Sequence, residues 1–281
     1  MSREPSISIV TPSFNQGAFI SEALQSVKNQ SYGDVEHLVI DGASQDQTTS
    51  ILRCHSEMEC WHHLQWISEP DRGQGDALNK GFARVQGEIV GWLNSDDRYL
   101  PGCFDHVARA FELHPEVDIV YGDYRLIDAT GRVERMRREI EFNAFILLYH
   151  RVLYIPTTST FFRRRIFDER NFLDQDLHYA LDFEFFLRLA IRGYRFKHIP
   201  VTLADFRMHK DSKSCSAAHT QLAEKGQITE AYSPLLRGLR SRAARRLATV
   251  ALSSSAAALR YSEKLFRGYY PERLSKDPLV P

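Results

Sequence analysis

The stretch EIVGWLNSDDRYLPG, residues 88–102, joins an apolar run to two adjacent carboxylates, Asp96 and Asp97, and then to a Pro-Gly break. The apolar run predicts a buried strand, and Pro101 with the pattern after it predicts the start of a helix. Two neighbouring carboxylates are costly at this position because each raises the free energy of ionising the other. They form either a solvated turn in which an aspartate caps the helix, or part of a site.

Short apolar runs alternate with amphipathic stretches through the first 120 residues. Runs rich in Ile and Val predict strands at residues 6–11, 35–40, 64–68, 88–93 and 118–121. Helical spacing of apolar residues predicts helices at residues 18–29, 47–56, 76–85 and 101–113. This alternation is typical of an α/β fold with a Rossmann-like, mostly parallel sheet flanked by helices.

The loops after the first four predicted strands are polar and rich in acids. In chain order they read TPSFNQG, DGASQDQT, EPDRGQGDALNKG and NSDD. Ligands of open parallel sheets bind outside the carboxyl ends of the strands, so these four loops meet at one edge. The sequence therefore predicts a binding site there, with Asp96 and Asp97 in it.

The second half of the chain has a different pattern. Residues 157–167 predict a strand that runs into a helix, residues 180–193 a strongly amphipathic helix, and residues 194–209 a strand with an irregular end. From residue 216 the composition shifts to Ala, Ser, Arg and Leu. We expect one α/β domain over residues 1–215, with halves at 1–122 and 123–215, followed by a basic helical appendage over residues 216–281.

Composition excludes some functions and sets the expected compartment. The chain has 281 residues, 43% of them hydrophobic, and 36 basic residues balance 36 acidic ones. Bulk charge therefore does not favour nucleic-acid binding. Four irregularly placed cysteines and no charged-then-apolar leader predict a reducing cytoplasm. No run approaches the roughly 18 apolar residues of a membrane span.

Four segments of the chain together resemble a bacterial family 2 glycosyltransferase of GT-A fold. They read SIVTPSFNQGAFISEALQSVKNQSY, HLVIDGASQDQT, SEPDRGQGDALNKGFARVQGEIVGWLNSDDRYLPG and LDFEFFLRLAIRG. The resemblance covers roughly residues 5 to 215. It implies that residues 1–122 bind a nucleotide sugar, that residues 123–215 supply the acceptor side and the base, and that the donor is a UDP-sugar.

The same resemblance assigns the loops to parts of the donor. Thr11, Pro12 and Ser13 are expected around the nucleotide, and Asp41 is expected to accept a hydrogen bond from the base. The third loop is expected to border the sugar, through Glu69, Asp71 and Arg72.

Asp96 and Asp97 match the metal motif of the family. The resemblance makes Asp97 the direct ligand and Asp96 the partner of ribose or of metal-bound water. Carboxylate oxygens beside phosphate suit Mn²⁺ or Mg²⁺. A cation between the pair and a pyrophosphate removes the repulsion between the two carboxylates.

The helix over residues 180–193 carries the expected general base. Asp182 and Glu184 are two residues apart and point about 200° from each other, so only one faces a cleft. The resemblance selects Asp182 as the base that deprotonates the acceptor hydroxyl, although Leu181 stands where the family commonly has an acid. Two alternatives remain: Glu184 is the base, or Asp182 only stabilises the helix N-terminus. One base and no nucleophile imply a single displacement with inversion.

His209 follows the last predicted strand in a short run with Arg207, Lys210 and Lys213. The resemblance places His209 near the diphosphate or the metal. The alternative is a polar residue in a surface loop.

The tail between residues 237 and 273 has nine basic residues and two acidic ones, a net charge of +7. Apolar residues recur beside the arginines at near-helical spacing: Leu235, Leu236, Leu239, Ala243, Leu247, Val250 and Ala251. Such a helix is typical of attachment to an anionic membrane surface, here the inner face of the plasma membrane. The alternative is a helix that packs on the catalytic domain or on a second copy in a homo-oligomer.

The most favoured function is an inverting glycosyltransferase for surface polysaccharide or glycan synthesis, acting on a saccharide or lipid-linked saccharide. A nucleotidyltransferase is the first alternative, but it would carry basic residues near TPSFNQGAF. A non-catalytic nucleotide-sugar-binding protein is the second, but it would lack the acids at 97 and 182.

Overall fold

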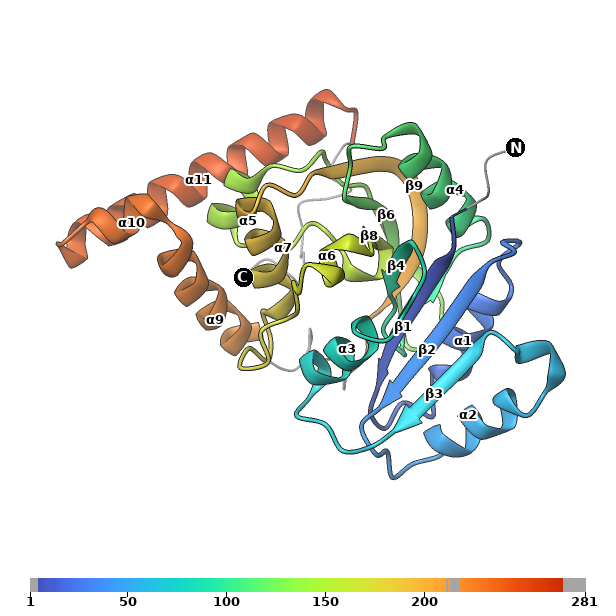
Figure 1. The fold of residues 1–281 in the computed structure, drawn as a ribbon. Coiled ribbons are helices and arrows are strands. Elements are labelled where there is room, and N and C mark those ends of the chain that lie inside the picture. Colours follow the sequence, from blue (N-terminus) through green and yellow to red (C-terminus); the bar gives the residue numbers. More distant parts are fainter. Residues whose placement is uncertain (1–4, 211, 213–217, 270–281) are drawn as a thin grey trace.

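The computed structural model describes residues 5–210, 212 and 218–269 (Figure 1). Its strands form one nine-stranded sheet in the order β3-β2-β1-β4-β8-β6-β9-β5, with β7 paired to β6. The strands are β1 (Ile7–Ser13), β2 (Val35–Asp41), β3 (Leu64–Ser68), β4 (Ile89–Trp92), β5 (Arg98–Tyr99), β6 (Ile119–Ile127), β7 (Val133–Arg137), β8 (Thr160–Arg163) and β9 (Phe196–Arg207).

Helices lie between these strands and after them. The helices are α1 (Ile20–Lys28), α2 (Thr48–Ser56), α3 (Gln74–Phe82), α4 (Cys103–Leu113), α5 (Ala144–His150), α6 (Arg165–Asp168), α7 (Leu181–Ile191), α9 (Ala218–Tyr232), α10 (Pro234–Gly238) and α11 (Arg242–Phe266). Two short 3₁₀-helices are η1 (Glu59–Trp61) and η2 (Thr157–Ser159). The predicted α/β fold with a mostly parallel sheet flanked by helices and helices at its C-terminal end is confirmed.

The apolar runs of β1, β2 and β4 are buried on both faces, whereas the edge strand β3 is only partly buried. Strands β1, β2, β3 and β4 pair in parallel with one another. Their central residues, such as Ile9 and Val90, are fully buried. Helices α1 and α4 cover one face of the sheet, and α3, α5 and α7 contribute to the core on the other. This arrangement brings the carboxyl ends of the four strands to one edge.

Gly81 sets the distance between α3 and the sheet. A Cβ atom at this position would lie 2.3 Å from Cγ1 of Val10, so any other residue would push the helix away from β1. Close packing of α3 fixes its first residue, Gln74, and the preceding loop, which carries Asp71.

The sheet departs from simple β/α alternation after β4. The predicted strand at 118–121 is the start of a longer strand, β6, which does not pair with β4. Strand β8 lies between them and is antiparallel to both. Beyond it, β9 runs parallel to β6 and ends at Arg207. This order brings the end of a strand from the second half beside the loop after β4.

The C-terminal helices are in contact with the domain that precedes them. Buried residues of the main core cluster include Ile228 of α9, Leu236 of α10 and Ala256 of α11. Helix α11 lies along α5, and its far end projects away from β1 to β3 (Figure 1). Among the described residues, no helix combines the length and the apolar character that a membrane span requires.

Candidate active site

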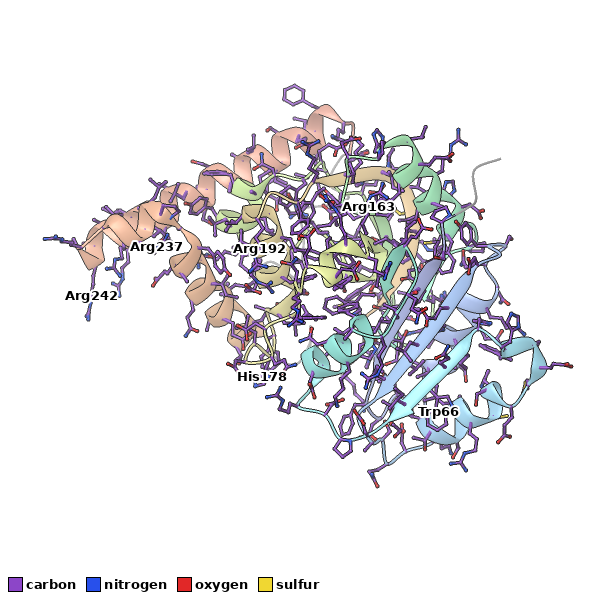
Figure 2. The ribbon with its side chains drawn as sticks, in the orientation of Figure 1. Trp66, Arg163, His178, Arg192, Arg237 and Arg242 are labelled. Atoms are coloured by element: carbon purple, nitrogen blue, oxygen red, sulfur yellow. The ribbon has the colours of Figure 1, made fainter. Side chains whose placement is uncertain are left out.

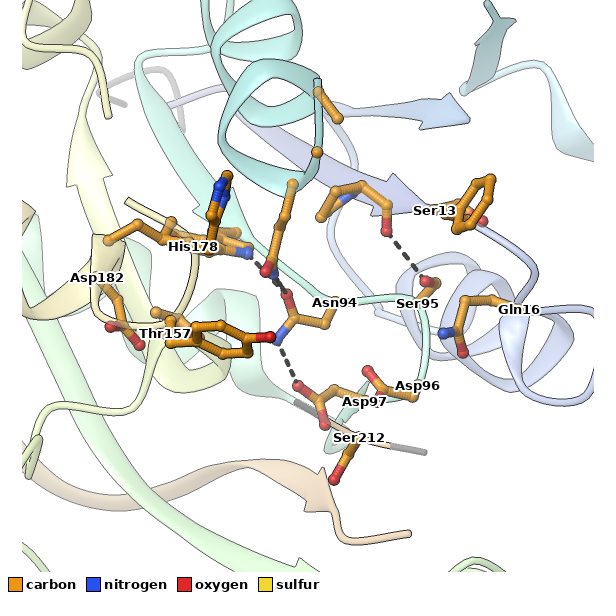
Figure 3. Close-up of a pocket in the computed structure, with 18 of the residues that line it drawn as sticks. Ser13, Gln16, Asn94, Ser95, Asp96, Asp97, Thr157, His178, Asp182 and Ser212 are labelled. Carbon is orange, nitrogen blue, oxygen red and sulfur yellow. Dashed lines mark hydrogen bonds between the residues drawn. The ribbon is translucent and has the colours of Figure 1, made fainter. Parts of the chain in front are cut away.

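A cavity of about 380 Å³ opens at the edge where the carboxyl ends of the strands meet (Figure 3). One wall comes from strand ends and the loops after them, with Ser13, Asp71, Asn94, Asp96 and Asp97. The other wall comes from the segment before α7, from α7 and from α9, with His178, Tyr179, Asp182 and Gln221. We call these the strand wall and the helical wall. Figure 3 shows Asp182 across the cavity from Asp96 and Asp97.

Asp97 is buried on the strand wall, with 1% of its surface exposed. Its Oδ1 accepts the backbone N–H of Arg207 at 2.8 Å. Its Oδ2 accepts Nδ2 of Asn94 at 3.1 Å and the hydroxyl of Thr158. Burial, with the Asp96 charge second, nevertheless raises the pKa of Asp97 to about 8. A cation bound beside Asp97 would therefore stabilise its ionised form.

Asp96 is more open to the cavity and contacts two basic side chains of the second half. Its Oδ2 lies 3.0 Å from Nε2 of His209, and its carbonyl accepts Nε of Arg207 at 2.8 Å. The ring of Phe19 lies against both, 4.7 Å from the His209 ring and 5.0 Å from the Arg207 guanidinium carbon. His209 thus lies at the acidic pair, and its approach to a diphosphate or a metal stays a prediction.

A network of ion pairs holds the residues of the strand wall in position. The buried Arg207 guanidinium pairs with Glu22 at 2.7 Å, and Glu22 pairs with Arg98 at 2.9 Å. Arg98 and Arg125 both bind the buried Asp205, at 2.7 and 2.6 Å. Buried charges persist only when they are paired, so this network holds the end of β9 against the loop after β4.

The residues of the strand wall fit a hard divalent cation. Asp96 and Asp97 offer carboxylate oxygens, and a cation would stabilise the ionised form of Asp97, which burial and the Asp96 charge disfavour. In the described part of the chain, no group of three or more His, Cys, Asp or Glu side chains could hold a metal. One or two carboxylates with substrate phosphate and water are the typical set for Mg²⁺ and suit Mn²⁺ as well.

The predicted nucleotide residues lie at the end of β1. Pro12 and Ser13 line the cavity, and the Pro12 carbonyl accepts the hydroxyl of Ser95 at 3.0 Å. Thr11 is fully buried, and its hydroxyl lies 2.9 Å from Nε2 of His37. Thr11 therefore acts within the sheet and contributes its backbone alone to this end of the strand.

Asp41 is buried at the end of β2. Its carboxylate binds the Ser44 backbone N–H at 2.9 Å, the Ser44 hydroxyl at 2.5 Å and the Ser68 hydroxyl at 2.7 Å. It is not among the residues lining the cavity. These bonds fix the carboxylate, and its contact with a nucleotide base stays a prediction.

The third acidic loop places one of its three predicted residues in the cavity wall. Asp71 lines the cavity, and its Oδ1 accepts the Gly73 backbone N–H at 2.7 Å. Glu69 pairs with Lys80 at 2.9 Å, and the exposed Arg72 bonds to Gln175. Glu69 and Arg72 thus hold the loop, while Asp71 faces the site.

Asp182 and Glu184 of α7 have different surroundings. Asp182 lines the cavity from the first turn of the helix, and its Oδ1 accepts the Phe183 backbone N–H at 2.7 Å. Glu184 is buried, pairs with Arg188 at 2.8 Å and accepts the Tyr232 hydroxyl at 2.6 Å. Of the two acids, Asp182 is the one that faces the cavity.

Sequence reasoning missed several residues of the site. Asn94 was visible in NSDD but received no role, and Thr158 has no local signal because η2 reaches Asp97 only through the sheet order. The sequence places Arg207 in the basic run of His209 but gives it no contact with Asp97, although an arginine at the end of a buried strand is itself a signal. Lys213 lies outside the described residues. Gln221 belongs to a helix assigned to the appendage.

Comparison with known proteins agrees with this geometry. The model of the glycosyl transferase family 2 matches residues 8–171. An uncharacterised glycosyltransferase of Mycobacterium tuberculosis (strain CDC 1551 / Oshkosh) is 32% identical over 194 residues, which cover 68% of this chain and 71% of that protein.

Two solved structures share the fold at low sequence identity. S. aureus TarS in complex with UDP-GlcNAc has a TM-score of 0.66 and 16% identity, over 98% of this chain and 78% of that one. The mannosyltransferase PcManGT from Pyrobaculum calidifontis, in complex with GDP-Man and Mn²⁺, has a TM-score of 0.61 and 23% identity, over 96% and 82%. With the family match over more than half its length, the chain belongs to glycosyl transferase family 2.

Proposed function

We propose that the protein is an inverting, metal-dependent glycosyltransferase that moves a sugar from a UDP-sugar to the hydroxyl of a saccharide or lipid-linked saccharide. One observation carries the proposal: the adjacent carboxylates Asp96 and Asp97, of which Asp97 is buried, face Asp182 across one cavity. A site with negative charge on one wall and a carboxylate on the other suits a nucleoside diphosphate held through a cation and a hydroxyl approaching from the opposite side.

Each residue has a defined part in this proposal. Asp182 takes the proton of the acceptor hydroxyl while the new bond to the anomeric carbon forms and the bond to the diphosphate oxygen breaks. Attack opposite the leaving group inverts the anomeric centre. Asp97 and Asp96 would hold Mn²⁺ or Mg²⁺, which supplies Lewis-acid stabilisation of the leaving diphosphate. Asp71, Ser13 and Asp41 are proposed to contact the donor, and His209 to approach the diphosphate.

Two comparisons support parts of this proposal. The similar structure that binds UDP-GlcNAc supports a nucleotide-sugar donor, and the one that binds GDP-Man with Mn²⁺ supports both a donor of this class and a cation. The two differ in the nucleotide, so the choice of UDP is a matter for experiment. The proposed process is bacterial surface polysaccharide or glycan synthesis.

A donor screen tests the function. Purified protein with Mn²⁺ is incubated with UDP-, GDP- and dTDP-sugars, and slow release of the nucleoside diphosphate is measured. We expect hydrolysis of one UDP-sugar above the others and its loss in excess chelator. Release of pyrophosphate from nucleoside triphosphates and sugar phosphates would instead indicate a nucleotidyltransferase. Tight donor binding with no turnover would indicate a non-catalytic binding protein.

We further propose that α11 attaches the enzyme to an anionic membrane surface. One face of the helix packs on the domain through Ala256 and through Arg260, which pairs with buried Glu139 at 3.0 Å. Leu247 and Leu265 are each nine residues from Ala256, about half a turn around the helix, and both are exposed. Membrane attachment would place the protein at the inner face of the plasma membrane.

Exposed arginines accompany this apolar face near the start of α11: Arg237, Arg240, Arg242, Arg245 and Arg246. Figure 2 shows Arg237 and Arg242 at the end of the molecule farthest from Trp66 of β3. Arginines near an apolar helix face attract anionic lipid. A second copy of the chain is the other occupant for this face, and it would appear as a dimer in light scattering.

A further inference from the structure

Helix α9 holds the backbone segment that leads into Asp182. The Glu224 carboxylate accepts the backbone N–H groups of Tyr179 and Ala180, both at 2.9 Å, and that of His178 at 3.4 Å. Nε2 of Gln221 donates to the Tyr179 carbonyl at 3.0 Å. No side chain caps the N-terminus of α7 at Ala180 itself. A carboxylate that binds consecutive N–H groups fixes the start of the helix, because these donors have no partner within the helix.

Lys225, the next residue of α9, is buried and directly follows Glu224, which binds the backbone before Asp182. Burial lowers the pKa of Lys225, and the negative charge of Asp182 opposes this change. The Lys225 ammonium also lies 5.9 Å from the ring of Phe183. A buried ammonium persists only where an opposite charge or another strong partner compensates for its lost hydration. Here the charge that compensates it is that of Asp182, the proposed base.

The far end of α9 is tied to the domain as well. The Tyr232 hydroxyl donates to Glu184 of α7 at 2.6 Å, and the Thr229 hydroxyl donates to the Leu148 carbonyl of α5 at 3.1 Å. The hydroxyl of Ser233, just after α9, lies 2.8 Å from that of Tyr149. These contacts give α9 a fixed position against α5 and α7, so Glu224 and Lys225 can hold Asp182 in place.

We propose that α9 belongs to the catalytic unit, with Glu224 and Lys225 as positioning residues that hold Asp182 at the cavity and keep it as a carboxylate. The proposal rests on the function proposed above. It extends that function to a helix beyond the residues matched by the family model and beyond the predicted domain boundary at residue 215.

Other charged and titratable groups share the surroundings of Asp182. The groups that share its surroundings are Glu224 and Lys225 from α9, His178 and Tyr179 from the segment before α7, and Asp71, Asp96, Asp97 and Arg207 from the strand wall. Among these described groups, Lys225 is the cation that α9 contributes. Its removal therefore changes the field at Asp182 while the strand wall stays intact.

Replacing Lys225 by methionine tests its role. The variant keeps a chain of similar length and loses a buried charge, so we expect a melting temperature no lower than that of the wild type. The acidic limb of the kcat profile should move to higher pH by on the order of one unit, because a nearby cation lowers the pKa of a carboxylate. Lys225→Arg should restore much of the profile. Arg109→Met, which removes an exposed cation from α4, is the matched control and should change nothing.

Glu224→Gln tests the backbone anchor. We expect kcat to fall about tenfold, since loss of the charge weakens the bonds to the three N–H groups, while the donor KM stays unchanged. Glu230→Gln, an exposed acid on the same helix, is its control. A proportional rise in donor KM with unchanged kcat would contradict positioning of the base.

A readout independent of turnover separates this inference from the proposed function. The ¹³C carboxyl resonance of Asp182, identified by its loss in Asp182→Asn, is titrated in the wild type and in Lys225→Met. A rise of the Asp182 pKa in the variant supports the inference, and an unchanged value overturns it. If the wild type turns over no nucleotide sugar, the proposed function fails, and this titration still decides whether Lys225 acts on Asp182.

Discussion

The two walls of the cavity are built in different ways. On the strand wall, Asp97 is buried and bound by groups from three separate segments, which are Asn94, Thr158 and Arg207. On the helical wall, Asp182 stands at the start of a helix whose preceding backbone is held by α9. The strand wall is fixed by sheet pairing and by buried ion pairs, whereas the helical wall depends on one helix from the C-terminal part of the chain.

Under the proposed function, this difference means that the two walls bind different parts of the reaction. A preorganised acidic wall suits the constant part of the chemistry, which is a diphosphate with its cation. The helical wall, with His178, Tyr179 and Gln221 around the proposed base, suits the acceptor. Three predictions test the two walls, and a fourth tests a surface outside them.

The largest effect is expected from the helical wall. Asp182→Asn keeps the shape of the side chain but cannot accept the proton, so we expect transfer to fall by about 10² to 10⁴-fold. Nucleotide binding, measured by calorimetry, should stay within about twofold of the wild type. The control is Glu184→Gln. If that variant is inactive and Asp182→Asn is active, the assignment of the base is wrong.

On the strand wall, Asp97→Ala should lower kcat/KM by about 10² to 10³-fold, the range for loss of a main electrostatic stabiliser. Unlike the change at Asp182, it should also weaken nucleotide binding in the presence of Mn²⁺. Calorimetry with and without chelator measures this difference. Full activity of the wild type in excess chelator would contradict the role of a metal at this wall.

His37 reports on how firmly the strand wall is packed. Burial, and secondarily the charge of His63, lowers its pKa to about 3. In the unfolded chain His37 binds a proton near pH 6.5, and in the folded chain it does not. Its contribution to stability is therefore complete above pH 6.5 and is lost as pH falls toward 3. Between pH 7 and pH 5 the free energy of unfolding should drop by about 2 kcal/mol from this residue.

Urea unfolding at both pH values measures the effect of His37. His37→Gln keeps a donor for Thr11 and should reduce the drop, while His62→Gln, at an exposed histidine, should leave it unchanged. An equal drop in both variants would mean that the wild-type pH dependence comes from other groups.

The smallest effect concerns α11, outside both walls. Leu247 and Val250 are 73% and 65% exposed, and changing both to glutamate should lower binding to anionic vesicles several-fold with little change in turnover of a water-soluble acceptor. Leu113→Glu, at a leucine 64% exposed on α4, is the control. Co-sedimentation at rising salt measures the binding, which should weaken as salt screens the arginines. Equal binding by all three proteins would exclude the α11 face as the attachment site.

The sequence offers two alternatives for the tail, a helix with an apolar face for a membrane surface and a helix that packs on the domain, and these two are not exclusive. Helical spacing marked Leu236 and Leu247 as members of one apolar stripe, yet Leu236 is buried in α10 and Leu247 is exposed on α11. Helix α11 packs on the domain through one face and exposes the opposite face. A break at Leu239 between α10 and α11 separates the two groups, and periodicity across residues 235–251 could not reveal it. Arg273, also part of the predicted basic tail, lies outside the described residues.

Local sequence determined the first half of the molecule. Alternating or continuous apolar runs, bounded by Gly, Pro and Asp, form β1 to β4. Because these strands are parallel, their carboxyl ends bring TPS, DGAS and NSDD to one edge of the sheet. Asp96 and Asp97 stand out because they directly follow a buried strand, whereas only the family resemblance selected Asp182 over Glu184.

Only the tertiary structure decided which distant groups complete the site. Thr158 and Arg207 reach Asp97 because β8 and β9 insert into the sheet in an order that no local pattern specifies. Glu224 and Lys225 reach the segment of Asp182 because α9 folds back onto α5 and α7. Such contacts join residues that are 40 or more positions apart, as Glu224 and Ala180 are at 44. They depend on which surfaces pack together, so a short stretch of sequence cannot predict them.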